Sequence, residues 1–377
     1  MLLQLIALAN SVAAQSIQNA TAETAAIRTF FYVGGDYTSD GDSGHIFHNQ
    51  MYVEKLSPIL SQSREERTPV VLIHGQAQTG TNFLNKPDGG KSWASHFLSA
   101  GHTVYIMDQT ARGRSAWQPG AGADMLSTYS AETIQQRFTA PSRYNLWPQA
   151  ELHTQWPGTG IMLDPTFDAF YASNVQFNPN ATFQQQTVQA AGAKLLDRIG
   201  EKVWVLGHSQ GGLMAVLIAD ARANLTKGII LLEPTGPPFQ DTIFSTQPVR
   251  DWGLTDIPLT YSPQVKDPLS DLIQQDVPAP DNSTISCILQ AEDPTPRKLV
   301  NLAPKPILTV TSEASYHALY DYCTVQYLKQ AGCAKTTHME LAKIGIHGNG
   351  HMMFMEKNSD DIWKAVHYPC SNHDKFC

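Results

Sequence analysis

A serine lies in residues 207–212, Gly-His-Ser-Gln-Gly-Gly, between two apolar runs. The run 203–206 before it predicts a buried strand, and the run 213–219 after it predicts a helix. A strand, a tight turn and a helix in this order expose a serine hydroxyl above a parallel sheet. The turn needs glycines beside the serine, because a Cβ there would clash with the flanking strand or helix. We therefore predict that Ser209 is a nucleophile for acyl transfer.

The base that would accept the serine proton is expected near the end of the chain. Residues 347–351 read His-Gly-Asn-Gly-His and follow residues 339–346, which we expect to form the last strand of the sheet. We favour His351 over His347, because Gly350 and His351 begin a Gly-His-x-x-x-x-Glu pattern. In that pattern the histidine precedes the final helix. His351 is therefore the predicted general base.

Two glutamates are candidates for the carboxylate that orients the base. Glu313 follows the apolar run 307–310, where most enzymes of this architecture place their acid. Glu233 directly follows the wholly apolar run 229–232. A carboxylate at the end of such a strand is costly to bury unless it is paired, for example with an imidazole. We favour Glu233, and Glu313 remains the alternative.

Two backbone N–H groups are expected to stabilise the oxyanion of the tetrahedral intermediate. Residues 74–76, His-Gly-Gln, follow the apolar run 70–73, and a loop of this type after an early strand commonly supplies one donor. The N-terminus of the helix behind the serine supplies another. The predicted donors are the backbone N–H groups of Gln76 and Gln210.

The remaining histidines do not predict a metal site. Two glycines lie between His347 and His351, so the pair does not share one helical face as zinc ligands at this spacing do. His45 and His48 lack a third ligand nearby in the sequence. His208, adjacent to the serine, is interpreted as structural and as pointing away from it. We predict no metal and no cofactor.

Short apolar runs recur along the chain without the alternation of a half-buried strand. They are residues 70–73, 104–107, 203–206, 229–232 and 307–310. Such runs are typical of strands buried on both faces, as in a parallel sheet covered by helices. Helical spacing of apolar residues is found in segments 92–100, 183–199, 213–224, 316–331 and 360–366. With a lead-in antiparallel hairpin at 30–56, this order predicts a doubly wound α/β fold, with functional groups after the carboxyl ends of the strands.

Two long segments interrupt the α/β pattern. Residues from about 116 to 182 are rich in Gly, Pro and aromatic side chains, and residues from about 235 to 306 hold many prolines. Segments this long inside a compact protein are usually lids or binding loops. We predict a cap insertion and a second lid insertion, both covering the site, within one domain that spans residues 15–377.

The N-terminus indicates export. Residues 1–9 are apolar but too short to span a bilayer, and the small residues at 12–14 offer a signal-peptidase site, which predicts a signal peptide at 1–14. The chain also holds four Asn-x-Ser/Thr sequons, at Asn19, Asn180, Asn224 and Asn282. We predict a secreted glycoprotein.

The five cysteines all lie in the last quarter of the chain, as expected for local disulfides in an oxidising compartment. If residues 324–330 are helical, Cys323 and Cys333 are too far apart to pair with each other. We therefore expect Cys287 to pair with Cys323 or Cys333, and Cys370 to pair with Cys377.

The formal charge of −8 and the charged fraction of 16% provide no basic face for nucleic acid. The expected partner is a small-molecule ester or lactone, with no nucleic acid and no membrane span. We expect a monomer or a homodimer.

Four motifs together resemble a family of secreted α/β-hydrolase esterases, known from a bacterial esterase and many fungal relatives. They are residues 71–80, 108–115, 207–212 and 347–353, and the likeness extends from about Phe30 to Lys364. In that family the serine of Gly-His-Ser-Gln-Gly, a glutamate after the sixth strand and the second histidine of His-Gly-Asn-x-His form the catalytic triad. The resemblance thus implies Ser209, Glu233 and His351. The bacterial member has two adjacent cysteines where this chain has Gln76 and Ala77, and backbone donation should survive that difference.

These features predict a secreted serine carboxylic-ester hydrolase, an esterase or lactonase acting through an acyl-enzyme on small apolar or aromatic esters. One alternative is a hydrolase or acyltransferase of secondary metabolism, in which a dry cap lets an alcohol resolve the acyl-enzyme. Another is a non-catalytic binding protein that keeps the fold, because a fold does not prove a function. A peptidase is less favoured, because nothing in the sequence marks a site for a charged peptide terminus.

Overall fold

The computed structural model describes residues 23–59, 67–118 and 126–371. The predicted signal peptide at 1–14, Asn19 and Cys377 of the predicted Cys370–Cys377 pair lie outside these ranges. No helix within the described ranges combines the length and the apolar character that a membrane span requires.

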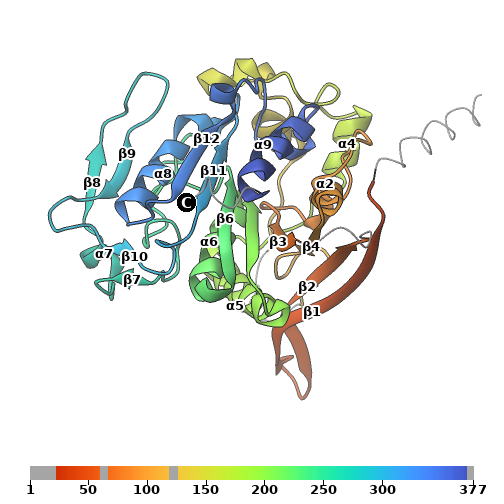
Figure 1. The fold of residues 1–377 in the computed structure, drawn as a ribbon, viewed down its shortest axis with the longest axis horizontal. Helices are drawn as coiled ribbons and strands as arrows, with labels where there is room; N and C mark the ends of the chain where they lie inside the picture. Colours follow the sequence, from red (N-terminus) through yellow and green to blue (C-terminus); the bar gives the residue numbers. More distant parts are fainter. Residues whose placement is uncertain (1–22, 60–66, 119–125, 372–377) are drawn as a thin grey trace, which may run out of the picture.

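A mostly parallel eight-stranded sheet forms the centre of the molecule, in the order β1-β2-β4-β3-β5-β6-β11-β12 (Figure 1). Its strands are β1 Ala26–Ser39, β2 His45–Pro58, β3 Arg67–Ile73, β4 His102–Met107, β5 Val203–His208, β6 Thr226–Leu232, β11 Ile307–Thr311 and β12 Thr336–Glu340. β1 and β2 form the antiparallel hairpin predicted for residues 30–56, and β2 is antiparallel to β4. All pairs from β4 to β12 are parallel. The carboxyl ends of these parallel strands therefore meet at one edge, as a doubly wound sheet requires.

Helices cover both faces of the sheet (Figure 1). One core cluster contains side chains of α5, α6 and α8, and the other contains side chains of α2 and α9. The helices are α2 Trp93–Ala100, α3 Ala131–Ile134, α4 Pro165–Tyr171, α5 Ala181–Ile199, α6 Gln210–Ala221, α7 Pro268–Asp271, α8 Asp321–Gln330 and α9 Ser359–Ser371. Shorter turns are the 3₁₀ segments Gly80–Phe83, Pro141–Arg143, Pro148–Leu152, Ala223–Leu225, Tyr316–Leu319, Leu341–Ile344 and Met353–Met355, and the π-helical segment Gln135–Thr139.

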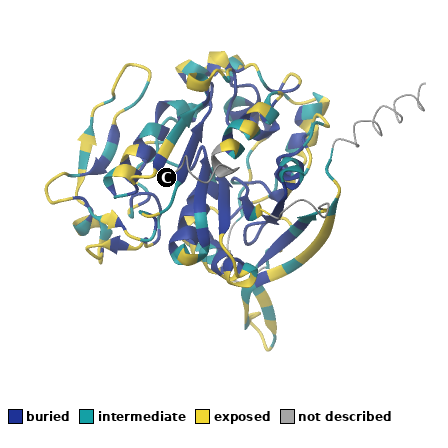
Figure 2. Cartoon of the chain, viewed as in Figure 1, coloured by how far each residue is buried: buried dark blue, intermediate teal, exposed yellow. Residues whose placement is uncertain are grey.

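The central strands are buried along their whole length (Figure 2). All residues of β4, β5 and β11 are buried, and in β3 and β6 only the first two residues and Lys227, respectively, are not fully buried. Both faces of these strands are removed from water by helices, which explains why their sequences are continuously apolar. The predicted doubly wound α/β fold class is confirmed.

Two predicted elements are wrong in their bounds. The last strand was expected at 339–346, but β12 is Thr336–Glu340 and is followed by the 3₁₀ turn Leu341–Ile344. Gly345, at φ 80°, ends that turn in the left-handed region that favours glycine. The predicted helix at 316–331 is divided into a 3₁₀ turn and α8, because Tyr320 between them is not helical.

The inserted segment predicted at 116–182 contains short helices where the structure describes it. α3, the π-helical segment Gln135–Thr139 and α4 lie in it, and an isolated bridge joins Ser127 to Phe177. The segment between β6 and β11 contains α7 and two small antiparallel pairs. These pair β7 Tyr261–Ser262 with β10 Lys298–Leu299, and β8 Gln274–Val277 with β9 Cys287–Gln290. Neither segment adds a strand to the main sheet within the described ranges.

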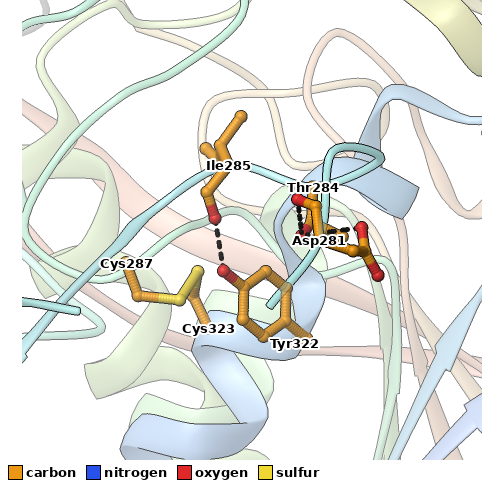
Figure 3. Close-up of a disulfide and its surroundings, with 6 residues drawn as sticks. All are labelled: Asp281, Thr284, Ile285, Cys287, Tyr322 and Cys323. Atoms are coloured by element: carbon orange, nitrogen blue, oxygen red, sulfur yellow. Dashed lines mark hydrogen bonds between the residues drawn. A yellow bond between two sulfur atoms is a disulfide. The ribbon is translucent and has the colours of Figure 1, made fainter. Parts of the chain in front are cut away.

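A disulfide joins Cys287 to Cys323, with 5.4 Å between the two Cα atoms (Figure 3). It confirms that Cys287 pairs with one of the two predicted partners and identifies that partner, while Cys333 is a buried free thiol. Beside the disulfide, the hydroxyl of Tyr322 donates a hydrogen bond to the carbonyl of Ile285 (Figure 3). The segment before β11 is thus tied covalently to the first turn of α8.

The sequon asparagines Asn180, Asn224 and Asn282 are all exposed. Asn180 is also the N-cap of α5, where its side-chain oxygen accepts a hydrogen bond from the backbone N–H of Phe183 at 3.0 Å. Glycosylation at these positions stays a prediction.

Candidate active site

Ser209 lies in the tight turn between β5 and α6. Its backbone has φ 55° and ψ −122°, a strained conformation for a residue with a side chain. A Cβ at Gly207 would lie 2.0 Å from the carbonyl oxygen of Gly211, and one at Gly211 would lie 2.3 Å from the carbonyl oxygen of Ile73. The two glycines are therefore required for the turn that holds Ser209 at the end of the strand.

His351 and Glu233 form a buried hydrogen-bonded pair, with 2.6 Å between Nδ1 and Oε2. Glu233 also accepts hydrogen bonds from the backbone N–H of Ser312 at 2.8 Å and from the hydroxyl of Ser315 at 2.7 Å. Because a carboxylate only accepts, Nδ1 of His351 carries the proton of this bond, and Nε2 of the neutral ring is left as a proton acceptor. The structure thus brings together two of the three predicted triad residues in the geometry of an oriented base.

The alternative acid and the alternative base pair with each other at the surface. His347 Nδ1 lies 3.0 Å from Glu313 Oε1, and the backbone N–H of Gly348 donates to Glu313 Oε2 at 2.8 Å. The His347 side chain is 62% exposed, whereas that of His351 is 1% exposed. Neither Glu313 nor His347 lines the cavity that Ser209 and His351 share.

His208 supports the loop that carries His351. Its Nε2–H donates to the carbonyl of His351 at 2.9 Å, and its ring packs against the His351 ring at 4.4 Å. Burial lowers the pKa of His208 to about 3, so the ring is neutral at physiological pH. This contact supports the interpretation of His208 as a structural residue.

Glu356, which ends the Gly-His-x-x-x-x-Glu pattern, stabilises the same loop through hydrogen bonds. It is fully buried and accepts hydrogen bonds from the backbone N–H of Gly350 and from the side-chain amide of Asn349. His153, in the segment between β4 and β5, lies 2.6 Å from Glu356 Oε1 through its Nε2. The His351 loop is therefore anchored to both the final helix region and the inserted segment.

Gln76 and Gln210 carry the predicted oxyanion donors, and Gln210 directly follows Ser209 in the chain. Gln210 is the first residue of α6, where backbone N–H groups have no acceptor within the helix. Gly75 is in contact with Ser209, since a Cβ at Gly75 would lie 3.2 Å from the Ser209 Cβ. Gln76 and Ser209 both line the cavity.

Arg112 links the two loops that carry the predicted oxyanion donors, a contact that sequence reasoning missed. Its guanidinium donates to the carbonyl of Gly75 at 3.2 Å and to the side-chain oxygen of Gln210 at 2.7 Å. Arg112 is fully buried, and burial lowers its pKa to about 9, which still leaves it charged at neutral pH. The only sequence signal was its place in the motif 108–115, which carries no information about this contact.

The cavity in front of Ser209 has a volume of about 280 Å³. Both inserted segments contribute to its wall: the first contributes Tyr129, Arg137 and Phe138, and the second contributes Asp241 and Phe244. Tyr316, His317 and Tyr320, from the turn after β11, complete the side near His351. Both inserted segments were expected to cover the site, and the first was expected to be rich in aromatic side chains, but the sequence did not identify which residues face the cavity. No short motif marks a position that faces a site only after folding.

Glu233, His317 and His351 place three ligand-type atoms within 4.8 Å of one another. Each is already engaged, because Glu233 binds His351, and His317 Nδ1 lies 2.8 Å from Asp321 Oδ1. The rings of His317 and His351 stack in parallel, with 6° between their planes. Imidazole lone pairs lie in the ring plane, so stacked rings do not converge on one ion. The geometry fits a hydrogen-bonded acid–base cluster better than a metal centre.

Burial lowers the pKa of His351 well below its ordinary value, and the neighbouring His208 and His317 lower it further. Only the neutral ring can accept a proton, so activity is lost as pH falls through this pKa. In a plot of kcat/KM against pH, we expect the acidic limb to have its midpoint below about pH 6.5, which is the ordinary pKa of histidine. Steady-state hydrolysis of an aryl ester between pH 4 and 9 measures it. A limb above the ordinary value would contradict the burial argument.

The chain is similar to known proteins in sequence and in fold. Residues 70–365 match the model of a family described as "Alpha/beta hydrolase family". Over 341 residues the chain is 47% identical to "Probable secreted lipase phiG" from Fungal sp. (strain ATCC 74256), covering 90% of this chain and 88% of that protein. A solved structure reported as "The Atomic Resolution Structure of a Novel Bacterial Esterase" aligns with a TM-score of 0.60 and 21% identity, over 92% of this chain and 96% of that one. At this identity the structural likeness supports the fold alone.

Proposed function

The chain belongs to the α/β-hydrolase family, and from this premise we propose that it is a secreted serine carboxylic-ester hydrolase with the triad Ser209, His351 and Glu233. The observation that carries the proposal is the buried 2.6 Å bond between Glu233 and His351, on the same cavity as a strained serine after a strand. A serine, a base and an orienting carboxylate are the three groups that acyl transfer requires.

In the proposed reaction, His351 Nε2 takes the proton from the Ser209 hydroxyl as its oxygen attacks the ester carbonyl carbon. The negative charge that develops on the carbonyl oxygen is stabilised by the backbone N–H groups of Gln76 and Gln210. The tetrahedral intermediate collapses with cleavage of the ester C–O bond. The protonated His351 gives its proton to the leaving alcohol, and the acyl group stays on Ser209. Water then repeats the sequence and releases the acid and the free serine.

The buried environment suits each proposed role. Burial raises the pKa of Glu233, the charge of Asp321 raises it further, and the hydrogen bonds from Ser315 and Ser312 oppose both effects. The hydrogen bonds from Ser312 and Ser315 favour the charged form of Glu233. The charged carboxylate accepts the hydrogen bond from His351 Nδ1–H, and this bond stabilises the imidazolium formed in the transition state. Arg112 would hold the two oxyanion donors in fixed positions relative to each other, because its guanidinium binds both loops.

The substrate class proposed for this site is a small apolar or aromatic ester or lactone. Phe138, Phe244 and Tyr316 supply aromatic surface around the cavity, which favours apolar groups beside the scissile bond. The volume of about 280 Å³ is at the lower end of ligand pockets, which favours a small substrate. The segments 116–182 and 235–306 are proposed as the cap and lid of a single domain that spans 15–377, because both contribute residues to the cavity wall.

The proposal of secretion has two supports. The fungal relative is named as a probable secreted lipase, and a disulfide joins Cys287 to Cys323. Disulfides persist in oxidising compartments. We propose that a signal peptide at 1–14 directs export and that sugars are attached at Asn19, Asn180, Asn224 and Asn282.

A fluorophosphonate probe and a panel of aryl esters and lactones test the proposed function. The purified protein is expected to react with one equivalent of probe, and peptide mass spectrometry is expected to locate the label on Ser209.

Apolar and aromatic esters are expected to be cleaved faster than acetates, because they fill the aromatic cavity. Equal rates on acetates would contradict the substrate class. Products with added alcohols would distinguish hydrolysis from acyl transfer, and absence of labelling would favour a binding protein.

A further inference from the structure

Arg137 lies on the wall of the cavity that contains Ser209. It belongs to the π-helical segment Gln135–Thr139, which directly continues α3. Its guanidinium carbon lies 4.0 Å from the centre of the Phe244 ring, so the two inserted segments meet at this contact. The next residue, Phe138, packs against the ring of His351 at 4.9 Å. The π-helical segment thus presents a cation and an aromatic ring to the same cavity.

The charges of the cavity wall do not balance around Arg137. Among the described residues that line the cavity, Arg137 is the single lysine or arginine, and Asp241 is the single carboxylate. Asp241 already has a cationic partner, because Arg250 Nη1 lies 2.9 Å from its Oδ1. No carboxylate within the described ranges forms an ion pair with Arg137. The guanidinium is therefore half-buried and has no carboxylate partner of its own among the described residues.

The charge of Arg137 acts on groups on two sides of the cavity. Burial raises the pKa of Tyr129 and of Tyr316, and in both cases the positive charge of Arg137 opposes the increase. Tyr129 comes from the first inserted segment and Tyr316 from the turn after β11. An anion between these phenols would meet a cation and hydroxyl groups on a wall that also holds the aromatic rings of Phe138 and Phe244.

The position of Arg137 suits the distal end of a bound ester. The Phe244 ring under the guanidinium contacts Tyr316 at 5.0 Å, and Tyr316 contacts His351 at 5.2 Å. The rings of Phe244 and Tyr316 thus form an apolar path from the guanidinium to the predicted base. A substrate that follows this path needs an apolar spacer between its scissile ester and its charged group. Arginine binds the two oxygens of a carboxylate with its planar fork while its flat face stacks on an aromatic ring.

We propose that Arg137 binds a carboxylate of the substrate, so that the preferred substrates are esters or lactones with an apolar spacer and a free carboxylate, such as half-esters of short diacids. This inference rests on the proposed function of Ser209 and makes its substrate class more specific. Phe138, Phe244 and Tyr316 surround the spacer, and the carboxylate replaces water at the guanidinium.

The test compares two esters of similar size that differ in charge, the mono-4-nitrophenyl ester of glutaric acid and 4-nitrophenyl hexanoate. The wild-type protein is expected to have the higher kcat/KM with the glutarate ester. Arg137→Gln is expected to lower the ratio of the two kcat/KM values by at least about tenfold, chiefly through KM, because one charge-assisted contact is lost. Arg137→Lys is expected to give an intermediate ratio, because the charge is kept without the fork.

Arg143→Gln is the matched control, since Arg143 is exposed in the turn Pro141–Arg143 and lies outside the cavity wall. Its ratio is expected to equal that of the wild type. Free glutarate should also inhibit hexanoate hydrolysis competitively in the wild type and much more weakly in Arg137→Gln. An equal loss on both esters, or no charge preference in the wild type, would overturn the inference.

Fluorophosphonate labelling separates this inference from the proposed function. A protein that labels on Ser209 and cleaves the hexanoate ester without any charge preference keeps the proposed function and loses the carboxylate subsite. A protein that does not label at all loses the proposed function. A preference for a phosphate-bearing ester over the glutarate ester would contradict the assignment of a carboxylate.

Discussion

Ser209→Ala is expected to abolish fluorophosphonate labelling and to lower kcat on aryl esters by about 10⁴- to 10⁶-fold, as removal of a nucleophile does in other serine hydrolases. The reason is that no other group can carry the acyl intermediate at the end of β5. Alanine keeps the Cβ of serine, so the strain at φ 55° is unchanged and the variant should fold. Labelling and turnover are measured with purified wild-type and variant protein at equal concentration.

Ser270→Ala serves as the control for this loss, since Ser270 is an exposed serine of α7 and lies outside the cavity wall. It should label and turn over like the wild type. Thermal unfolding of all three proteins shows whether the fold is kept. If Ser209→Ala labels at the wild-type rate, the nucleophile is a different residue.

Glu233→Gln is expected to lower kcat by about 10³- to 10⁴-fold, because a neutral amide no longer fixes the tautomer of His351 or stabilises its cationic form. The amide keeps almost the same shape and an oxygen that can still accept from the Ser312 N–H. The fold is therefore expected to survive, and the loss should be in kcat. Steady-state kinetics on one activated ester measure it.

Glu313→Gln is the matched comparison, because Glu313 pairs with the exposed His347 at 3.0 Å and lies outside the cavity wall. A change of no more than a few-fold is expected there. The reverse ranking of the two variants would show that Glu313 is the acid. Equal large losses with lowered unfolding temperatures would instead point to damage of the fold.

The fold class could be predicted from the sequence because its signals are local. Strands buried on both faces have continuously apolar sequences, as in β5 and β6, and the helix positions follow from the spacing of apolar residues. The end of the chain was harder to predict. Residues 341–346 contain enough apolar side chains for a strand, but Gly345 allows a left-handed turn and only Leu341 of the preceding turn is buried.

The choice between two glutamates and two histidines could be argued from the sequence but needed three-dimensional positions. Each glutamate follows a strand, and each histidine lies in one short loop. The tertiary structure pairs Glu233 with His351 in the interior and Glu313 with His347 at the surface. Burial separates the two pairs, and burial depends on which elements pack above the loop.

The sequence by itself determined the turn around Ser209, because its signals lie within a few residues: an apolar strand, a glycine at 207 that leaves room for the backbone of Gly211, and an apolar helix. Only the tertiary structure decided what surrounds that serine. Arg112, Arg137 and Phe244 reach the site from segments far apart in the chain, and no periodicity or motif relates them. Their positions result from long-range packing of irregular segments on the sheet, which local propensity does not specify.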